Sequence, residues 1–266
     1  MTAMTIGAAL IEGAAKIGRT DARVLLAFAT GRAKEYFIMH PEAELTEPQA
    51  QVYRAAVARA AAGCPVPYIT GRQSFWGRNF AVNEHVLIPR PDTETLIEAV
   101  LALTPAPNSI LDMGTGSGCI AVTLALELAH ASITATDVSA EALAVAQQNA
   151  QALGAGNVAF AQGAWYAAVP GKTFDVIVSN PPYIEPGDEH LENLTFEPIG
   201  ALTDGIDGLS DIREIAAHAA DHLNAGGHLM LEHGYNQGPA VRAILSEAGF
   251  AEVATVRDLG GNDRIT

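Results

Sequence analysis

The chain has 266 residues, 49% of them hydrophobic, and a formal net charge of −15. A chain of this length is near the size at which one hydrophobic core divides into two, so two domains are expected. The N-terminal segment is broken by charged residues and no apolar run reaches the length of a membrane span, so we expect neither a signal peptide nor a membrane helix, and a cytoplasmic location.

The charge is unevenly divided along the chain. Residues 1–75 carry eight Lys/Arg and six Asp/Glu, a net +2, whereas residues 76–266 carry seven and twenty-four, a net −17. Binding to a phosphate backbone is driven by counterions released as lysines and arginines approach. The acidic part therefore favours protein over nucleic acid as a macromolecular partner.

The first part of the chain has the composition and end signals of helices. Asp21 is predicted to begin one helix, ARVLLAFAT. Thr46 and Gln49 have the spacing of a capping box, with a proline between them in the first turn, and predict the start of another. Residues 1–73 are therefore predicted to be a small helical bundle, which ends at the CPVP run of residues 64–67.

A hairpin and a strand-helix alternation follow the predicted bundle. SFWGRNFAVN, within residues 74–90, reads as two short aromatic strands that turn at Gly77. In residues 91–266, helices separate the apolar runs SILDM, SITATD, VAFAQ, FDVIVS, HLMLEHG and AEVATVRD. This alternation is typical of a mostly parallel sheet with helices on both faces, which binds ligands at the carboxyl ends of its strands.

A glycine loop, MGTGSG, follows the first of these strands and opens a helix. Its glycines, Gly114, Gly116 and Gly118, form G-x-G-x-G rather than the dinucleotide fingerprint G-x-G-x-x-G. A shorter loop fits a ligand without a pyrophosphate, and Asp137, which ends the next strand, can accept hydrogen bonds from two ribose hydroxyls. A nucleoside without a diphosphate describes S-adenosylmethionine; the alternative is a glycine turn with a helix-capping aspartate.

Two further strand ends carry candidate site residues. Trp165 follows the third strand, where an adenine is expected, and can stack on it, although ordinary packing remains an alternative. Asn180 follows FDVIV, which we expect beside the glycine-loop strand, and precedes Pro181, Pro182 and Tyr183. The Asn180 side-chain oxygen and the Pro181 carbonyl can hold both N–H groups of a planar NH₂, and the prolines keep that pair rigid. The pattern leaves open whether the NH₂ belongs to a base or a side-chain amide, and whether NPPY is only a rigid turn.

The motifs LDMGTGSG, ATD, VSNPPYI, FEP and LEHG, with the linker TGRQSFWGRNFAVNEHVLIPRPDTE, together resemble the HemK/PrmC family. These are protein-glutamine methyltransferases that modify peptide-chain release factors, and the likeness spans nearly the whole chain. It implies a class I S-adenosylmethionine-dependent methyltransferase: a Rossmann-like, mostly parallel seven-stranded sheet in residues 91–266 with its last strand antiparallel, a β-hairpin linker in 74–90, and a substrate-docking helical domain in 1–73.

The resemblance also assigns roles to residues. It implies that the cofactor is bound by Gly114, Thr115, Gly116, Ser117, Gly118, Asp137, Trp165 and Asn180. The substrate glutamine, from the Gly-Gly-Gln motif of class 1 release factors, would lie on Asn180, Pro181, Pro182 and Tyr183, with Asn180 and Pro181 as the catalytic pair and Tyr183 flat against the incoming group. The segment of residues 88–91 is expected to cover the cofactor. One departure is Ala164, where many relatives have an acidic residue before the tryptophan, so weaker cofactor binding is expected.

A histidine pair and two cysteines have ordinary structural interpretations, and two other functions remain as alternatives. His218 and His222 have the spacing of a zinc pair but no third ligand, so they are predicted to face solvent and no metal is expected. Cys119 is predicted to be a packed thiol. Cys64 and Cys119 are too few and too far apart in the sequence for a disulfide framework. The alternatives are an adenine-N6 methyltransferase acting on DNA or RNA, which shares NPPY, and a non-catalytic cofactor-binding scaffold.

Overall fold

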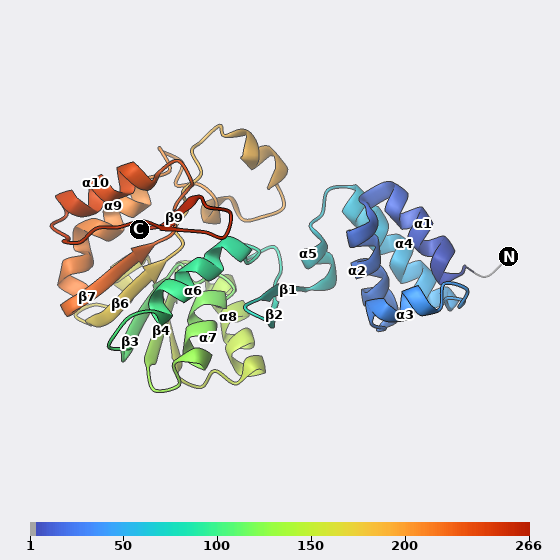
Figure 1. Cartoon of the computed structure of the whole chain (residues 1–266), viewed down its shortest axis with the longest axis horizontal. Coiled ribbons are helices and arrows are strands. Elements are labelled where there is room, and N and C mark those ends of the chain that lie inside the picture. Colours follow the sequence, from blue (N-terminus) through green and yellow to red (C-terminus); the bar gives the residue numbers. More distant parts are fainter. Residues whose placement is uncertain (1–3) are drawn as a thin grey trace. The chain divides into compact units, whose positions relative to one another are not determined.

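In a computed structural model of the chain, residues 4–266 are described, and they divide into two compact units, one ending at Arg72 and one formed by Gln73–Thr266 (Figure 1). Residues 1–3, the start of the predicted helical domain, lie outside the described residues. The helices of the first unit are α1 (Ile6–Ile17), α2 (Arg19–Thr30), α3 (Lys34–Met39), α4 (Glu47–Ala61) and α5 (Val66–Thr70).

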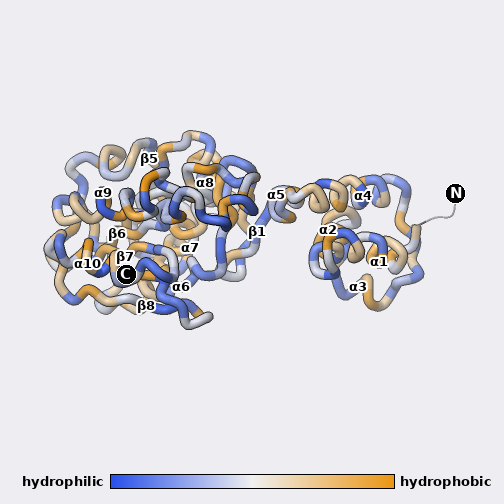
Figure 2. The backbone as a smooth tube through the Cα atoms, turned by 90° about the horizontal axis from the view of Figure 1, so that it is seen from above, coloured by the Kyte–Doolittle hydropathy of each residue, from blue (hydrophilic) through white to orange (hydrophobic). Residues whose placement is uncertain are grey.

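Hydrophobic and hydrophilic stretches alternate along these helices (Figure 2), so each can bury one side. The buried sides meet in one core that includes Ile6, Leu25, Leu26, Phe37 and Tyr53. The first unit therefore has a hydrophobic core of its own.

The helix ends of the first unit test three predictions. The capping box is confirmed, because Gln49 N–H donates to Thr46 Oγ1 at 3.4 Å and Thr46 N–H donates to Gln49 Oε1 at 3.0 Å. The predicted start at Asp21 is wrong: α2 begins at Arg19, and Asp21 lies in its first turn. The CPVP run does not end the helical part either, since α5 begins at Val66 with a proline in its first turn, where no backbone donor is needed.

The second unit begins with the predicted hairpin, formed by β1 (Arg72–Phe75) and β2 (Arg78–Ala81). Between them Trp76 has φ 50° and Gly77 has φ 68°, and a two-residue turn of this kind needs positive φ at both positions. The short helix η1 (Pro91–Thr93) follows and leads directly into α6 (Glu94–Leu101).

A five-stranded parallel sheet forms the centre of the second unit, with strand order β5-β4-β3-β6-β7. Its strands are β3 (Ser109–Met113), β4 (Ser132–Asp137), β5 (Val158–Gln162), β6 (Phe174–Ser179) and β7 (Leu223–Leu231). Strand β6 pairs with β3, with Met113 opposite Ser179, which confirms the predicted neighbours. The ends of the glycine-loop strand and the asparagine strand therefore lie side by side.

The expected seven-stranded sheet is not what the structure has. Strands β8 (Val256–Arg257) and β9 (Asp263–Ile265) form a separate antiparallel pair. The segment of β9 still lies antiparallel to the end of β7: Glu232 and Ile265 form an isolated bridge, Leu231 and Thr266 exchange backbone hydrogen bonds at 2.8 and 3.0 Å, and His233 N–H donates to the Arg264 carbonyl at 3.0 Å. The predicted strand AEVATVRD is wrong in its length: only Val256–Arg257 pair, and Glu252 near its start takes a left-handed conformation, φ 56°, that is not extended.

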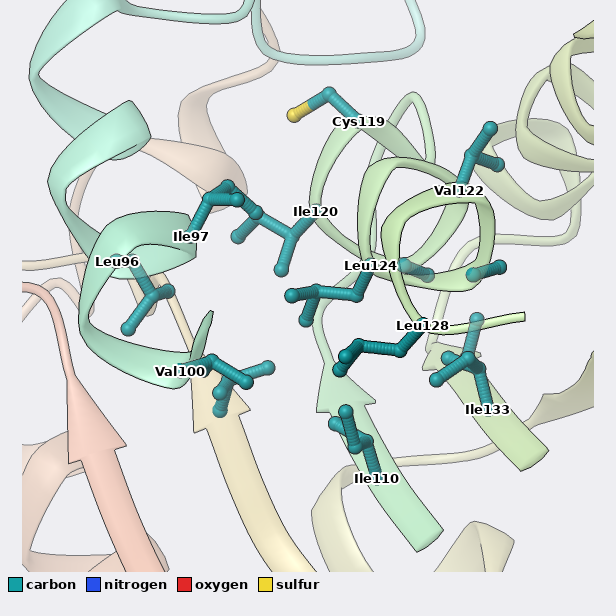
Figure 3. Close-up of a cluster of buried hydrophobic side chains, with 14 of the residues drawn as sticks. Leu96, Ile97, Val100, Ile110, Cys119, Ile120, Val122, Leu124, Leu128 and Ile133 are labelled. Carbon is teal, nitrogen blue, oxygen red and sulfur yellow. The ribbon is translucent and has the colours of Figure 1, made fainter. Parts of the chain in front are cut away.

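Helices cover both faces of the sheet (Figure 1). One core contains Ile110 of β3 with side chains of α6 and of α7 (Cys119–Glu127), and α8 (Ala140–Leu153) adds to it (Figure 3). The other contains Leu111 of β3 with side chains of α9 (Ser210–Ala219) and α10 (Gly238–Glu247). Successive residues of a strand point to opposite faces, so β3 is apolar on both. The remaining short helices are η2 (Trp165–Ala168), η3 (Glu189–Asn193), η4 (Ile199–Ala201) and η5 (Ala220–His222).

Candidate active site

A cavity of about 470 Å³ lies in the second unit at the carboxyl ends of β3, β4 and β6. The predicted site residues in its wall are Gly114, Thr115, Gly116, Ser117, Asp137, Trp165, Asn180, Pro181 and Pro182. Gly118 and Tyr183 are not in the wall. Residues 84–87, 89 and 90, from the segment that follows the hairpin, complete one side, together with Pro198, Gly200 and Ala201.

The glycine loop is held by hydrogen bonds to the end of the neighbouring strand, β4. Gly116 N–H donates to Asp137 Oδ2 at 2.9 Å, and Thr115 N–H donates to the Thr136 carbonyl at 2.9 Å. Gly116 has φ 53° and an added Cβ there would meet nothing within 4 Å, so a ligand can approach this backbone closely. Gly118 is needed for packing rather than for ligand access. An added Cβ would lie 3.0 Å from the Cβ of Ala146, so the absence of a side chain at Gly118 lets the loop pack against α8.

Asp112 is buried in β3, one residue before the strand ends at Met113 and the glycine loop begins. Its Oδ2 accepts from the Thr115 hydroxyl at 2.6 Å and from Ala121 N–H at 3.1 Å, while Oδ1 has no hydrogen-bond partner among residues 4–266. Burial raises the pKa of Asp112 to about 7, in spite of the two hydrogen bonds. The sequence interpretation treated this residue as part of a strand, although an acidic residue inside an apolar run was a signal that it is special.

Asp137 and Trp165 bound the same cavity from the next two strands. The other oxygen of Asp137, Oδ1, accepts from Ser139 N–H at 2.9 Å, and each carboxylate oxygen keeps a second lone pair for a ligand. Trp165 has φ 44°, an uncommon conformation for a bulky side chain, and it also packs against the core on the α9 side of the sheet. Trp165 is therefore both a packing residue and a wall residue.

Asn180 follows β6 at the end nearest the glycine loop. The strand ends rigidly there, because the Ser179 hydroxyl donates to the Met113 carbonyl at 2.8 Å and the Ser179 carbonyl accepts from Glu232 N–H at 3.0 Å. The Asn180 amide donates from Nδ2 to Thr93 Oγ1 at 3.4 Å, at the start of α6. Sequence reasoning had no signal for this contact, since the partners are 87 residues apart.

Tyr183 does not line the cavity, and its expected contact with the incoming group stays a prediction. Its hydroxyl donates to Glu232 Oε1 at 3.2 Å, and its carbonyl accepts from Gln237 Nε2 at 2.9 Å. Burial raises the pKa of the Tyr183 hydroxyl well above its usual range, and the nearby Glu232 carboxyl raises it further. Tyr183 is thus a protonated donor fixed behind the cavity wall.

Glu197, the glutamate of the FEP motif, joins two segments of the cavity wall. Its side chain is 2% exposed, accepts from Ile88 N–H at 3.0 Å and forms an ion pair with Arg90. Arg90 and the neighbouring Pro198 both line the cavity. The segment of residues 88–91 was expected to cover the cofactor, and Glu197 is the residue that holds it; the sequence interpretation gave Glu197 no role.

Comparison with known proteins identifies the family. The PrmC N-terminal domain family matches residues 3–71, and the methyltransferase small domain family matches residues 91–197. A release factor glutamine methyltransferase of Neisseria gonorrhoeae (strain ATCC 700825 / FA 1090) is 47% identical over 258 residues, which cover 96% of this chain and 94% of that protein. The chain belongs to the release factor glutamine methyltransferase family.

Other comparisons agree with this membership. A release factor glutamine methyltransferase of Escherichia coli (strain K12) is 43% identical over 251 residues, 93% of this chain and 91% of that protein. A methyltransferase from Pyrococcus furiosus covers 80% of this chain and 94% of its own with a TM-score of 0.54, at 20% identity. A ribosomal protein L11 methylase from Lactobacillus delbrueckii subsp. bulgaricus covers 73% and 86% with a TM-score of 0.51, at 24% identity. The two structures show the fold, and family membership makes this chain a methyltransferase with a Rossmann-like catalytic unit.

The residues of this methyltransferase fit S-adenosylmethionine, the cofactor expected from the loop. The cavity has room for a nucleoside-sized ligand, and Gly116 leaves the backbone open to it. Asp137 carries free acceptor capacity, while Asp112 Oδ1 and Ser117 Oγ are buried polar atoms without partners in residues 4–266. The roles of the individual residues remain predictions.

The features set aside in the sequence have ordinary surroundings in the methyltransferase. His218 lies 3.7 Å from Glu214 with both side chains exposed, and His222 Nδ1 lies 2.8 Å from the Lys172 carbonyl. Within residues 4–266 no group of three or more His, Cys, Asp or Glu side chains has the arrangement of a metal site, and no helix is long and apolar enough to span a bilayer. Cys119 is buried, which raises its pKa to about 12, so it is the packed thiol that was predicted.

Proposed function

We propose that this methyltransferase transfers a methyl group from S-adenosylmethionine to the side-chain amide nitrogen of the glutamine in the Gly-Gly-Gln motif of class 1 peptide-chain release factors. The observation that carries the proposal is that Asn180 and Pro181 share one cavity with the glycine loop and Asp137, in a chain with the release factor methyltransferase sequence. The cofactor end and the amide-binding end thus belong to a single site.

At the cofactor end, the proposed ligands are Gly114, Thr115, Gly116, Ser117, Asp137, Trp165 and Asn180, with Gly118 supporting the loop. Asp137 would accept from the ribose hydroxyls and Trp165 would lie against the adenine. When bound, S-adenosylmethionine supplies a methyl group made electrophilic by its sulfonium.

At the substrate end, the chemical difficulty is that an amide nitrogen is a poor nucleophile, because its lone pair is delocalised into the carbonyl. The Asn180 side-chain oxygen and the Pro181 carbonyl would accept the two N–H groups of the glutamine and fix the direction of that lone pair. Pro181 and Pro182 restrict the backbone, so these acceptors need no rearrangement when the substrate enters. No strong base is needed before transfer, because the proton can leave the nitrogen afterwards.

The two parts of the chain are proposed to divide the work. Residues 1–73 would dock the release factor, and residues 91–266 would bind the cofactor and catalyse methyl transfer. Residues 74–90 would link these two parts of the chain. The net +2 of residues 1–75 and −17 of the remainder support a protein substrate and no direct nucleic-acid binding. A cytoplasmic location is proposed with it, because peptide-chain release factors would be the substrate. The same charge disfavours the adenine-N6 alternative, and the NPPY wall of the cavity disfavours a non-catalytic scaffold.

The test is methyl transfer from labelled S-adenosylmethionine to a purified class 1 release factor. A copy of the factor with its Gly-Gly-Gln glutamine replaced, and a duplex DNA, serve as the two controls. We expect label on the intact factor alone, and label lost with Asn180→Ala in the enzyme. Label on DNA would move the activity to adenine methylation, and binding of cofactor without any label would favour the scaffold.

A further inference from the structure

Arg90 brings a positive charge into a cavity wall whose other charged side chains are acidic. Among the residues of the described range 4–266 that line the cavity, Arg90 is the single lysine or arginine, whereas Glu84, Asp137 and Asp211 contribute carboxyls. Building on the proposed function, we propose that Arg90 binds the carboxylate of the methionine part of S-adenosylmethionine, and that Glu197 is the positioning residue that holds the Arg90 guanidinium at the cavity.

Arg90 lies at the end of the cavity that contains Asn180. The Arg90 carbonyl accepts from Thr93 N–H at 3.2 Å, and Thr93 Oγ1 accepts from Asn180 Nδ2 at 3.4 Å. Asp137 ends β4, which is two strands from β6 in the sheet. A cofactor with its ribose at Asp137 and its methyl group at Asn180 therefore spans the strand ends. Its amino-acid part is attached to the same sulfur as the methyl group, so it falls on the side of Arg90.

The guanidinium of Arg90 has hydrogen-bonding capacity left for a ligand. A guanidinium has five N–H donors in one plane, and Arg90 Nη2 donates to Glu197 Oε1. This is the one hydrogen-bonding contact of the guanidinium within the described part of the chain. The side chain is 35% exposed and lines the cavity, so the remaining N–H groups are accessible to a ligand there. They can form the paired hydrogen bonds that a carboxylate accepts from an arginine.

Glu197 fixes the position of this guanidinium. Its side chain is buried and its two oxygens have different partners: Oε1 accepts from Arg90, and Oε2 accepts from Ile88 N–H at 3.0 Å. One carboxylate thus holds both the backbone and the arginine side chain of the same short segment. Because Glu197 already orders Arg90, less side-chain entropy is lost when a ligand binds the guanidinium.

The charges of S-adenosylmethionine fit this arrangement. The cofactor has a positive sulfonium, a positive ammonium and a negative carboxylate. The three wall carboxyls attract the two cations but repel the carboxylate, which needs a donor of its own. Since Glu197 already balances the charge of Arg90, the attraction depends on the direction of the free N–H groups rather than on net charge. Lysine lacks this planar set of donors and is not expected to replace the arginine.

The test uses two ligands that differ in the part that Arg90 is proposed to bind. S-adenosylhomocysteine has the amino-acid carboxylate, whereas 5′-methylthioadenosine has the same adenine, ribose and sulfur but no amino acid. Calorimetry gives the Kd of each for the full-length wild type and for Arg90→Met, which keeps an extended side chain without the guanidinium. We expect Arg90→Met to raise the Kd for S-adenosylhomocysteine about 10- to 100-fold, as for other hydrogen bonds between charged groups, and the Kd for 5′-methylthioadenosine by less than about twofold.

Two further variants separate ligand binding from the structure of the wall. Arg78→Met removes an arginine that pairs with Glu127 at 2.7 Å and does not line the cavity, so it should leave both Kd values unchanged. Glu197→Gln keeps an oxygen for Ile88 N–H but presents an NH₂ to the Arg90 donor. It should weaken S-adenosylhomocysteine selectively, with little added loss when combined with Arg90→Met, because Glu197 acts through Arg90.

An unchanged Kd for S-adenosylhomocysteine in Arg90→Met, or an equal loss for both ligands, would overturn the assignment of Arg90. An equal loss for both ligands in Glu197→Gln would overturn the positioning role, since Glu197 would then maintain the wall alone. Release factor labelling is a separate measurement. If the wild type and Arg90→Met bind the two ligands as expected but the wild type labels no release factor, the proposed substrate fails and the Arg90 assignment stands. If the wild type binds neither ligand, both fail.

Discussion

Gly208 lies against the backbone of the NPPY motif and has no room for a side chain. An added Cβ would be 2.4 Å from the Tyr183 carbonyl oxygen, and the residue has φ 69°. Gln237 Nε2 donates to both the Tyr183 and the Gly208 carbonyls, so the two segments are held together at this point. The position of Tyr183 therefore depends on a glycine 25 residues further along the chain.

Gly208→Ala should therefore displace Tyr183 and lower kcat at least about tenfold, with a loss of stability of about 2 kcal/mol from strain and overlap. The control is Gly205→Ala, because Gly205 has a similar φ, 74°, but no atom within 4 Å of an added Cβ. That variant carries the backbone strain without the collision. Thermal unfolding and kcat measured on both would separate the two effects, and equal kcat values for the two variants would contradict the prediction.

Ala164 is a second residue with a direct test. It lines the cavity beside Trp165, where the family resemblance led us to expect an acidic side chain. Ala164→Asp should tighten S-adenosylmethionine binding about tenfold, because a hydrogen bond to a charged acceptor is worth about 1.5–3 kcal/mol. Calorimetric titration would measure this, with Ala164→Leu as a control for added bulk. An unchanged Kd in the aspartate variant would mean that the adenine does not need this acceptor.

Single residues differed in how far the sequence alone could reveal them. Asn180 was predictable because an amide and two prolines directly after an apolar strand are an unusual local pattern. Glu232 and Thr93 were not assigned, since what makes them special is a partner 49 or 87 residues away. Glu232 nevertheless left a local signal, an acidic residue at the end of the apolar run LMLE.

Among the secondary-structure elements, α8 joins the hairpin to the glycine loop through one side chain. Asn149 is buried, accepts from Ala81 N–H at 2.7 Å, and donates to the carbonyls of Ala81 at 3.0 Å and Ser117 at 2.8 Å. All the hydrogen-bonding groups of this amide are thus engaged by β2 and by the loop.

Asn149→Leu should lower the free energy of unfolding by about 3 kcal/mol, because it leaves one buried backbone carbonyl, at Ser117, and two partly buried backbone groups, at Ala81, without their partner. It should also weaken cofactor binding, since Ser117 is part of the loop. The matched control is Gln148→Leu, one position earlier on the exposed side of α8, which should change either quantity little. Chemical denaturation with a cofactor titration measures both, and equal stability of the two variants would show that Asn149 is dispensable.

Elements with strong local signals were predicted well, and those defined by tertiary contacts were not. The capping box fixed the start of α4 because both of its hydrogen bonds are local. Helix α5 was missed because two prolines were taken as a stop, although a first turn tolerates them. The strand AEVATVRD was predicted too long, because its composition is that of a strand but pairing with β9 is limited to Val256–Arg257.

At the scale of the whole molecule, two buried carboxyls couple stability to pH. Burial raises the pKa of Asp112 and the pKa of Glu232 to about 7, from 3.8 and 4.5. The folded state therefore holds more protons than the unfolded state between these values, so stability is greatest below about pH 4 for these groups and is lost as the pH rises through 7. Asp204 does not affect stability between pH 4 and pH 7. Burial alone would raise its pKa, but hydrogen bonds from backbone N–H groups outweigh burial and lower the pKa to about 2.

Asp112→Asn should remove one of these two contributions. The difference in unfolding free energy between the variant and wild type should shift in favour of the variant from pH 4 to pH 8, by up to about 4 kcal/mol. The amide itself changes the unfolding free energy by an amount that does not vary with pH, so the slope of the difference against pH is the measured quantity. Denaturation at a series of pH values would give it, and parallel curves for the two proteins would contradict a raised pKa.

The contacts that close the cavity wall also have a consequence for the order of folding. Ile88 and Glu197 are 109 residues apart, Asn180 and Thr93 87, and Asn149 and Ala81 68. Contacts this distant close large loops and form slowly, whereas the helices of both units need only neighbours along the chain. During refolding, the far-ultraviolet circular dichroism signal should therefore recover before the ability to bind S-adenosylmethionine. Cofactor binding would then report the last step of folding, and the bound cofactor would stabilise only chains that have completed it.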